Sequence, residues 1–198
     1  EQERIRLAEE LQVAQRMQGS LLPAVTPAIE GYQIAHAWDP AREVGGDFYD
    51  FIPLSRGRLG LLMADVADKG VPAALFMATT STLLRAAAQG YASPDRVLLH
   101  ANKGINANNR ADMFVTAWYG VLDPTSHRVT FANAGHSLAL HMAATDGAIR
   151  QLRPAGMPLG VTDDLSLAHE RATLAPGDML LLYTDGVIDA LNEVGEDF

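Results

Sequence analysis

Apolar and polar positions divide the chain into a polar helical start, a short run of strands, two helices and a strand-rich second half. In residues 1–18 charged and other polar side chains fill most positions, and a sparse seam recurs with spacings of four and three. The seam residues are Leu7, Leu11, Ala14, Gln18 and Leu21. We interpret residues 1–23 as a coiled-coil or linker helix that ends at Gly19 and Pro23, with an amphipathic surface helix as the alternative. Because this helix is so polar, we expect it not to pack on its own domain. We place the domain itself at residues 24–198.

The rest of the chain predicts an α+β domain with antiparallel sheets. Period-two patterns bounded by turn residues predict strands over 32–39, 47–53 and 59–64. Two helices follow over 70–89 and 93–108, each with a proline near its first turn, where a missing N–H costs nothing. Six further strands are predicted over 114–122, 128–134, 137–142, 148–152, 166–173 and 179–183. Strands in succession, rather than alternating with helices, indicate antiparallel pairing.

Composition narrows the class of function. The 198 residues suit one domain, and 48% hydrophobic with 20% charged residues can form a real core. A net charge of −9 disfavours nucleic acid and anionic lipid as partners. The chain has no cysteine, which excludes disulfides, thiolate zinc sites and a cysteine nucleophile. No apolar run reaches the about 18–20 residues of a membrane span, and the charged start shows no signal peptide, so we expect a cytoplasmic protein.

Three aspartates carry the candidate chemistry. Asp65 and Asp185 each follow an apolar run that predicts a buried strand, and Asp47 follows two glycines. A carboxylate held at such a place is best tolerated beside a cation. Converging carboxylates without His or Cys indicate hard divalent ions, and two of these about 3.5–4 Å apart can share a bridging water and lower its pKa. The predicted reaction is attack of that activated water on a phosphoester, without a covalent enzyme intermediate.

Each of these residues also has a plainer interpretation. An aspartate before glycine is usually a turn residue, so any one of the three is weak evidence alone. We interpret Asp50 as structural and Asp68 as a charge near a helix N-terminus. His136, in Asn133-Ala134-Gly135-His136, is more typical of a structural turn than of a catalytic group.

Taken together, the motifs resemble the bacterial branch of the type 2C metal-dependent protein phosphatases, the group of SpoIIE and RsbU. The matching stretches occur in the family's order and span nearly the whole chain. They are residues 18–23, 44–50, 64–78, 113–123, 133–136, 156–160 and 183–190.

This resemblance implies an α-β-β-α sandwich, two antiparallel sheets flanked by helices, with the metals at one end. It implies two Mn²⁺ or Mg²⁺ ions held by Asp47, Asp65, the Val66 backbone carbonyl and Asp185. It further implies a protein serine/threonine phosphatase acting on phosphoserine of a signalling protein, typically an anti-sigma-factor antagonist. Such domains usually follow a sensor or receiver domain, which fits a coiled-coil start and a homodimer.

One departure concerns the C-terminus. The family has a further aspartate in an Asp-Asp-x-Thr stretch, and this sequence stops at Asp197-Phe198 before it. Asp197 sits too near Asp185 along the chain to replace that ligand. We therefore expect the phosphatase domain of residues 24–198 to be incomplete at its C-terminus.

Two other functions compete with a phosphatase. A catalytically weak pseudophosphatase that only binds its partner would explain an absent ligand. A diguanylate cyclase is suggested by Gly45-Gly46-Asp47-Phe48-Tyr49, but Phe48 stands where that signature has glutamate, and the order of the other motifs differs.

Overall fold

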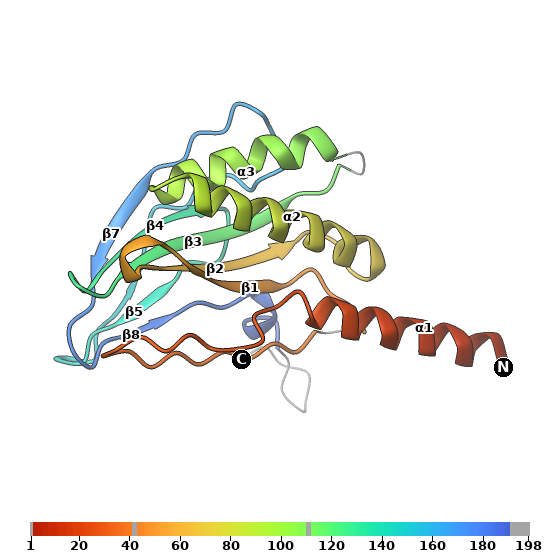
Figure 1. The fold of residues 1–198 in the computed structure, drawn as a ribbon, viewed down its shortest axis with the longest axis horizontal. Coiled ribbons are helices and arrows are strands. Elements are labelled where there is room, and N and C mark those ends of the chain that lie inside the picture. The colour runs from red at the N-terminus through yellow and green to blue at the C-terminus, as the bar shows by residue number, and fades with distance from the viewer. Residues whose placement is uncertain (1, 41–42, 110–111, 191–198) are drawn as a thin grey trace.

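Two antiparallel sheets and three α-helices make up the part of the chain that the computed structural model describes, residues 2–40, 43–109 and 112–190. Two of the helices lie over the outer face of the larger sheet, and the smaller sheet lies under its other face (Figure 1). The α+β class, with two antiparallel sheets and flanking helices, is therefore confirmed. The expectations for residues 191–198, including Asp197, lie outside the described residues.

The larger sheet has five strands in the order β1-β2-β3-β4-β7, all antiparallel to their neighbours. These are β1 (Phe48–Pro53), β2 (Leu59–Val66), β3 (Val115–Asp123), β4 (Arg128–Ala134) and β7 (His169–Thr173). In β3 and β4 consecutive residues are buried, because both faces of the sheet are covered there.

Helices α2 (Val71–Gly90) and α3 (Pro94–Asn108) form the layer above this sheet, where the first hydrophobic core lies. Met77 and Leu84 of α2 and Leu98 of α3 are fully buried in it. By length and composition α2 could cross a membrane, but its packing on the sheet is that of a core helix.

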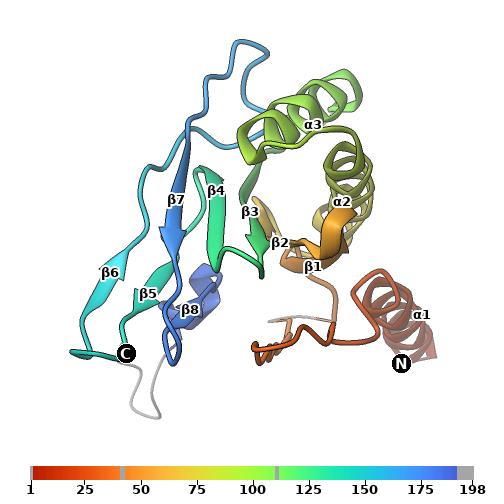
Figure 2. The same ribbon diagram turned by 60° about the vertical axis from the view of Figure 1, so that its left-hand side comes forward.

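The smaller sheet has three strands in the order β6-β5-β8 and covers the opposite face of the larger one (Figure 2). They are β5 (Leu140–Met142), β6 (Ile149–Gln151) and β8 (Met179–Leu181). A second core lies between the sheets, where the rings of Trp118 and Phe131 stack with centroids 5.6 Å apart. The molecule thus has two cores, one on each face of the larger sheet.

Helix α1 (Gln2–Gly19) projects from the body, with its N-terminus at the far end (Figure 1). Residues 2–10 are all exposed, as the prediction of a helix that does not pack on its own domain requires. Its last turn differs from that prediction, because Gln18 is buried against the domain with 4% of its surface exposed.

The observed elements match the predicted ones except in one segment. The prediction of a strand over 32–39 is wrong: the segment forms no ladder, and only an isolated bridge joins its first residue, Tyr32, to Ile29. Tyr32 and Ile34 pack on the second core while Gln33 and Ala35 are exposed. The alternation that suggested a strand therefore reflects packing on one side without a hydrogen-bonded partner strand.

Candidate metal centre

Asp47 and Asp65 lie side by side at one end of the larger sheet. Phe48 at the start of β1 pairs with Ala64 of β2, and both belong to the core under the helices. Successive side chains of a strand point to opposite faces, so Asp47 and Asp65 point toward the space between the sheets. Asp65 lies inside β2 rather than after it, opposite Thr116 of β3. The two predicted ligands are therefore brought together by strand register.

The electrostatics of this pair are unfavourable without a cation. The pKa of Asp65 is raised to about 8, first by burial, then by its hydrogen bond to the Asp47 carboxyl group and by the charges of Asp47 and Asp185. Lys69 opposes the shift but does not cancel it. Two adjacent carboxyl groups in this setting hold a proton between them, as like charges do when nothing neutralises them.

Asp185 stands close to the pair but remains exposed at the start of the short helix η2 (Asp185–Val187). Its neighbour Thr184 fixes its position, because the Thr184 hydroxyl donates a hydrogen bond of 2.8 Å to Asp47 Oδ2. Asp185 is near enough to raise the pKa of Asp65. Within residues 2–40, 43–109 and 112–190, however, no three acidic or histidine side chains lie close enough together to hold an ion.

Val66, the predicted backbone ligand, is in close contact with Gly46. A Cβ placed on Gly46 would lie 2.6 Å from the Val66 carbonyl oxygen, closer than atoms can approach. The Val66 N–H donates to the Gly46 carbonyl at 3.4 Å. Glycine is thus required at position 46 because the backbone before Asp47 lies directly on the backbone after Asp65.

Half-buried Thr116 and buried His136 form a polar contact beside Asp65. Thr116 Oγ1 lies 2.8 Å from His136 Nδ1 and donates to the Asp65 carbonyl at 3.4 Å. The His136 N–H donates to Asn133 Oδ1 at 2.7 Å, as the structural-turn interpretation of His136 predicts. Burial lowers the pKa of His136 to about 4, against the opposing effects of the Asp47 charge and the Tyr183 backbone. The imidazole is therefore neutral near pH 7.

Two further aspartates near the pair have other contacts. Asp50 is buried on the helix face of β1, where Arg85 of α2 forms an ion pair with it at 2.6 Å. That agrees with a structural role. Asp68 is exposed, and its carboxylate accepts a hydrogen bond of 2.7 Å from the Lys69 N–H. It lies outside the first turn of α2, so we find no contact that makes it the helix-terminal charge that we predicted.

Sequence reasoning missed Thr116 and Thr184, which are uncharged and bond the candidate ligands Asp65 and Asp47. No pattern in the sequence marks Thr116, because its role follows from the register that places it opposite Asp65. Thr184 does have a signal, since it immediately precedes a candidate ligand at the end of an apolar run.

The donor set fits a hard divalent cation. Asp47 and Asp65 are paired, half-buried carboxyl groups that share a proton, and their oxygens are the kind of ligand that such a cation prefers. The neutral His136 adds no positive charge beside them.

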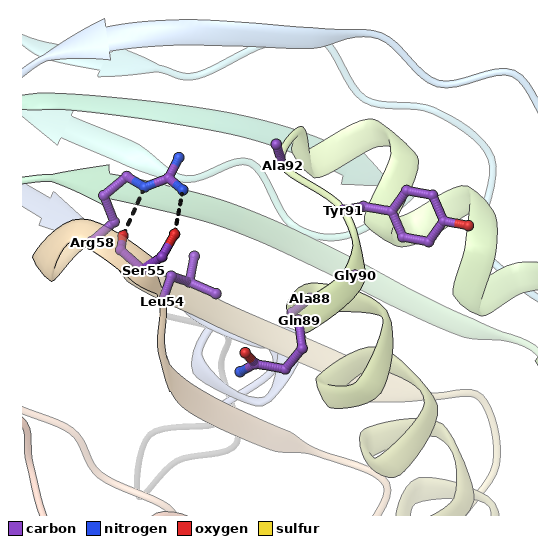
Figure 3. A pocket seen from close by; sticks show the side chains of 8 residues that line it. All are labelled: Leu54, Ser55, Arg58, Ala88, Gln89, Gly90, Tyr91 and Ala92. Atoms are coloured by element: carbon purple, nitrogen blue, oxygen red, sulfur yellow. Dashed lines mark hydrogen bonds between the residues drawn. The ribbon is translucent and has the colours of Figure 1, made fainter.

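A hollow of about 240 Å³ lies elsewhere, between residues 54–58 and the C-terminal end of α2 (Figure 3). Arg58 there donates to the carbonyl and hydroxyl of Ser55, each at 3.2 Å. Its lining contains no carboxylate, so it offers no site for the metals.

Comparisons with known proteins identify the family. The family model described as stage II sporulation protein E (SpoIIE) matches residues 55–198. Phosphoserine phosphatase RsbU of Bacillus subtilis is 30% identical over 189 residues, which are 96% of this chain and 56% of that protein. Protein IcfG of Synechocystis is also 30% identical, over 96% of this chain and 34% of its own length. The chain thus spans about half, or less, of the curated relatives that it matches.

Solved structures agree on the fold. The RsbU and RsbW domains of Rv1364c from Mycobacterium tuberculosis superpose with a TM-score of 0.65 at 32% identity, over 78% of this chain and 42% of that one. The SiaA-PP2C domain of Pseudomonas aeruginosa reaches a TM-score of 0.81 at 24% identity, over 98% and 78% of the two chains. The family match includes Asp65 and Asp185 and covers most of the sequence. The chain belongs to the stage II sporulation protein E (SpoIIE) family.

Proposed function

We propose that the chain is a metal-dependent protein serine/threonine phosphatase that hydrolyses phosphoserine on a signalling protein such as an anti-sigma-factor antagonist. The observation that carries the proposal is the Asp47–Asp65 pair, two carboxyl groups held together by the register of β1 and β2. Support comes from relatives, since RsbU and RsbP of Bacillus subtilis, 30% and 27% identical, are both named phosphoserine phosphatases.

The metals in this proposal are two Mn²⁺ or Mg²⁺ ions. Asp47, Asp65, Asp185 and the Val66 carbonyl are the proposed ligands. RsbX, whose fold is similar to that of this chain, has been solved in complex with magnesium. When bound, such ions supply the positive charge that activates water and neutralises the oxygens of the phosphoryl group.

The chain's own residues prepare this centre. The Thr184 hydroxyl occupies one lone pair of Asp47 Oδ2 and thereby sets the orientation of that carboxylate. Thr116 joins neutral His136 to the Asp65 backbone. Neither contact brings a positive charge to the two carboxyl groups, so neither competes with the metals for them.

Substitution of Asp65 tests the function. Asp65→Asn should reduce Mn²⁺-dependent phosphate release from a phosphoserine protein by more than about 100-fold, because one charged ligand is lost. Asp146→Asn, at an exposed turn between β5 and β6, is the matched control and should keep normal turnover. Normal phosphate release by folded Asp65→Asn protein would refute the assignment.

A binding module is the second candidate. It is favoured by one observation: the described residues bring two acidic groups together, and no third joins them closely enough to hold an ion. Such a pseudophosphatase would bind the phosphorylated partner without releasing phosphate. Calorimetry with Mn²⁺, together with phosphate release from the same sample, distinguishes the two functions.

We also propose the setting in which the domain acts. Its relatives are about twice its length or longer, which fits an upstream sensor or receiver domain joined through α1. The exposed first half of α1, with Leu7 at 57% exposure, offers a surface for a homodimer. A net charge of −9 fits a cytoplasmic protein that binds neither nucleic acid nor anionic membrane.

A further inference from the structure

The last turn of α1 is bound to the segment that presents Asp47. Gln18 Nε2 donates to the Gly45 carbonyl at 2.5 Å, and the Gly45 N–H donates to Gln18 Oε1 at 3.1 Å. One side-chain amide thus satisfies both backbone groups of Gly45, as a partner strand would. Gln18 is the buried residue of an otherwise exposed or half-buried helix.

A second contact joins the same two segments. The Trp38 indole N–H donates to the Asp47 carbonyl at 3.0 Å. The Trp38 ring lies beside Gly19, so that a Cβ on Gly19 would be 4.0 Å from Trp38 Cζ3. Gln18 of α1 therefore bonds the backbone before Gly46, and Trp38, which lies beside the end of α1, bonds the backbone after it.

The segment that these contacts hold is fixed by hydrogen bonds and backbone contacts more than by side-chain packing. Val44 and Phe48 are buried and anchor its two ends. Between them stand Gly45 and Gly46, which have no side chains to pack and lose more conformational freedom on ordering than other residues. Hydrogen bonds to Gly45 are therefore a main restraint on the path of the chain into Asp47.

Gly46 carries that restraint to a second proposed ligand. It lies against Val66 so closely that no Cβ would fit, and it accepts the Val66 N–H. A shift of Gly45 would thus displace the Asp47 carboxylate and the Val66 backbone together. The contacts run from Gln18 through Gly45 and Gly46 to both strands that end at the site.

We propose that Gln18 is a positioning residue of the metal centre, which holds Asp47 and the Val66 carbonyl in place by its paired hydrogen bonds to Gly45. This rests on the proposed function, because it presumes that Asp47 and Val66 bind metal. It assigns to the helix α1 a direct structural role in the site, in addition to any role in dimer formation.

Metal affinity measured on the intact protein tests the proposal. Gln18→Leu keeps the size of the side chain but removes both hydrogen bonds, and should weaken Mn²⁺ binding by about tenfold in calorimetry. Gln12→Leu, on the exposed surface of the same helix, is the matched control and should bind Mn²⁺ normally. In chelator, both variants should unfold at similar temperatures, because neither residue belongs to the two hydrophobic cores.

A second variant separates the hydrogen bonds from helix association. Gln18→Glu removes the donor and sets a carboxylate against the Gly45 carbonyl, while disfavouring a coiled coil that Gln18→Leu would favour. Loss of Mn²⁺ affinity in both variants supports the proposal. Unchanged affinity in either folded variant overturns it, as does unfolding of both in chelator, which would make Gln18 a residue of the fold alone.

The reference variant Asp65→Asn separates this proposal from the proposed function. If the wild type binds Mn²⁺ no better than Asp65→Asn, the metal centre itself is refuted. If the wild type binds Mn²⁺ and Asp65→Asn does not, while Gln18→Leu binds like Gln12→Leu, only the positioning role of Gln18 is refuted.

Discussion

Thr184 and Asp47 are joined by a hydrogen bond of 2.8 Å between residues 137 positions apart. It links two sheets: Thr184 follows β8 of the smaller sheet, and Asp47 precedes β1 of the larger one. Asp185 is the next residue, so this bond constrains the distance between two proposed ligands, Asp47 of the larger sheet and Asp185 after the smaller one.

Thr184→Val should therefore weaken the metal site without disturbing the cores. Loss of a hydrogen bond to a carboxylate costs about 1.5–3 kcal/mol, so Mn²⁺ affinity should fall by roughly tenfold or more in calorimetry. Thr184→Ser keeps the hydroxyl group and should retain the affinity. Equal affinities for the Val and Ser variants would show that the bond does not position Asp47.

The pH dependence of stability tests the Asp47–Asp65 pair without any metal. The folded-state pKa of Asp65 is raised from 3.8 to about 8, so between these values the folded protein holds a proton that the unfolded chain has released. The free energy of unfolding therefore falls as pH rises through this window. In chelator, Asp65→Asn should lose less stability between pH 4 and pH 8 and should melt above the wild type at pH 8. If the melting temperatures of the two proteins changed equally with pH, the shared proton would be contradicted. Asp146→Asn serves as the control.

The ion pair between Asp50 and Arg85 should contribute to the stability of the fold. The Asp50 side chain is 5% exposed and that of Arg85 50%, so removing Arg85 leaves a carboxylate nearly buried without its counter-charge. Arg85→Met should lower the free energy of unfolding by about 1–3 kcal/mol, less than for a fully buried pair because Arg85 is half in solvent. Asp50→Asn combined with Arg85→Met should recover part of the loss in urea unfolding. A double variant less stable than Arg85→Met would refute this account.

The seam of α1 should determine oligomeric state and catalytic rate. Changing Leu7, Leu11 and Ala14 together to polar residues should abolish association, measured by light scattering, and alter phosphate release. The test uses the protein with the proposed sensor domain and its signal, so that regulation can be observed. If a monomeric variant kept the same turnover and metal affinity, α1 would act only as a tether and would not regulate the site.

Most regular elements could be predicted because their apolar residues either recur with a helical or strand period or form a short run bounded by turn residues. The strand over 128–134 coincides with β4, and the helix over 70–89 with α2 within a residue at each end. Residues 32–39 could not be predicted correctly, since Tyr32 and Ile34 have the burial pattern of a strand and lack only its partner. The apolar pattern of a segment does not show whether its backbone has a hydrogen-bonded partner strand.

The charged residues of the candidate site could be proposed from the sequence, whereas the residues that bond them could not. Asp47, Asp65 and Asp185 could be chosen because carboxylates in apolar surroundings need a cation. The partners Thr116 and Arg85 depend on the neighbouring strand or helix, which the sequence does not specify. Gln18 did carry a signal, as a polar residue within a seam of apolar ones, but it was interpreted as part of helix association rather than as a contact with Gly45.

The Gln18–Gly45 contact has a thermodynamic consequence. If ordering α1 raises the affinity for metal, linkage requires that bound metal stabilise the end of α1 by the same free energy. Metal binding and any interaction that orders α1 then each strengthen the other by the same free energy. Amide hydrogens in the last turn of α1 should accordingly exchange more slowly with solvent when Mn²⁺ is added, although the helix touches no metal itself.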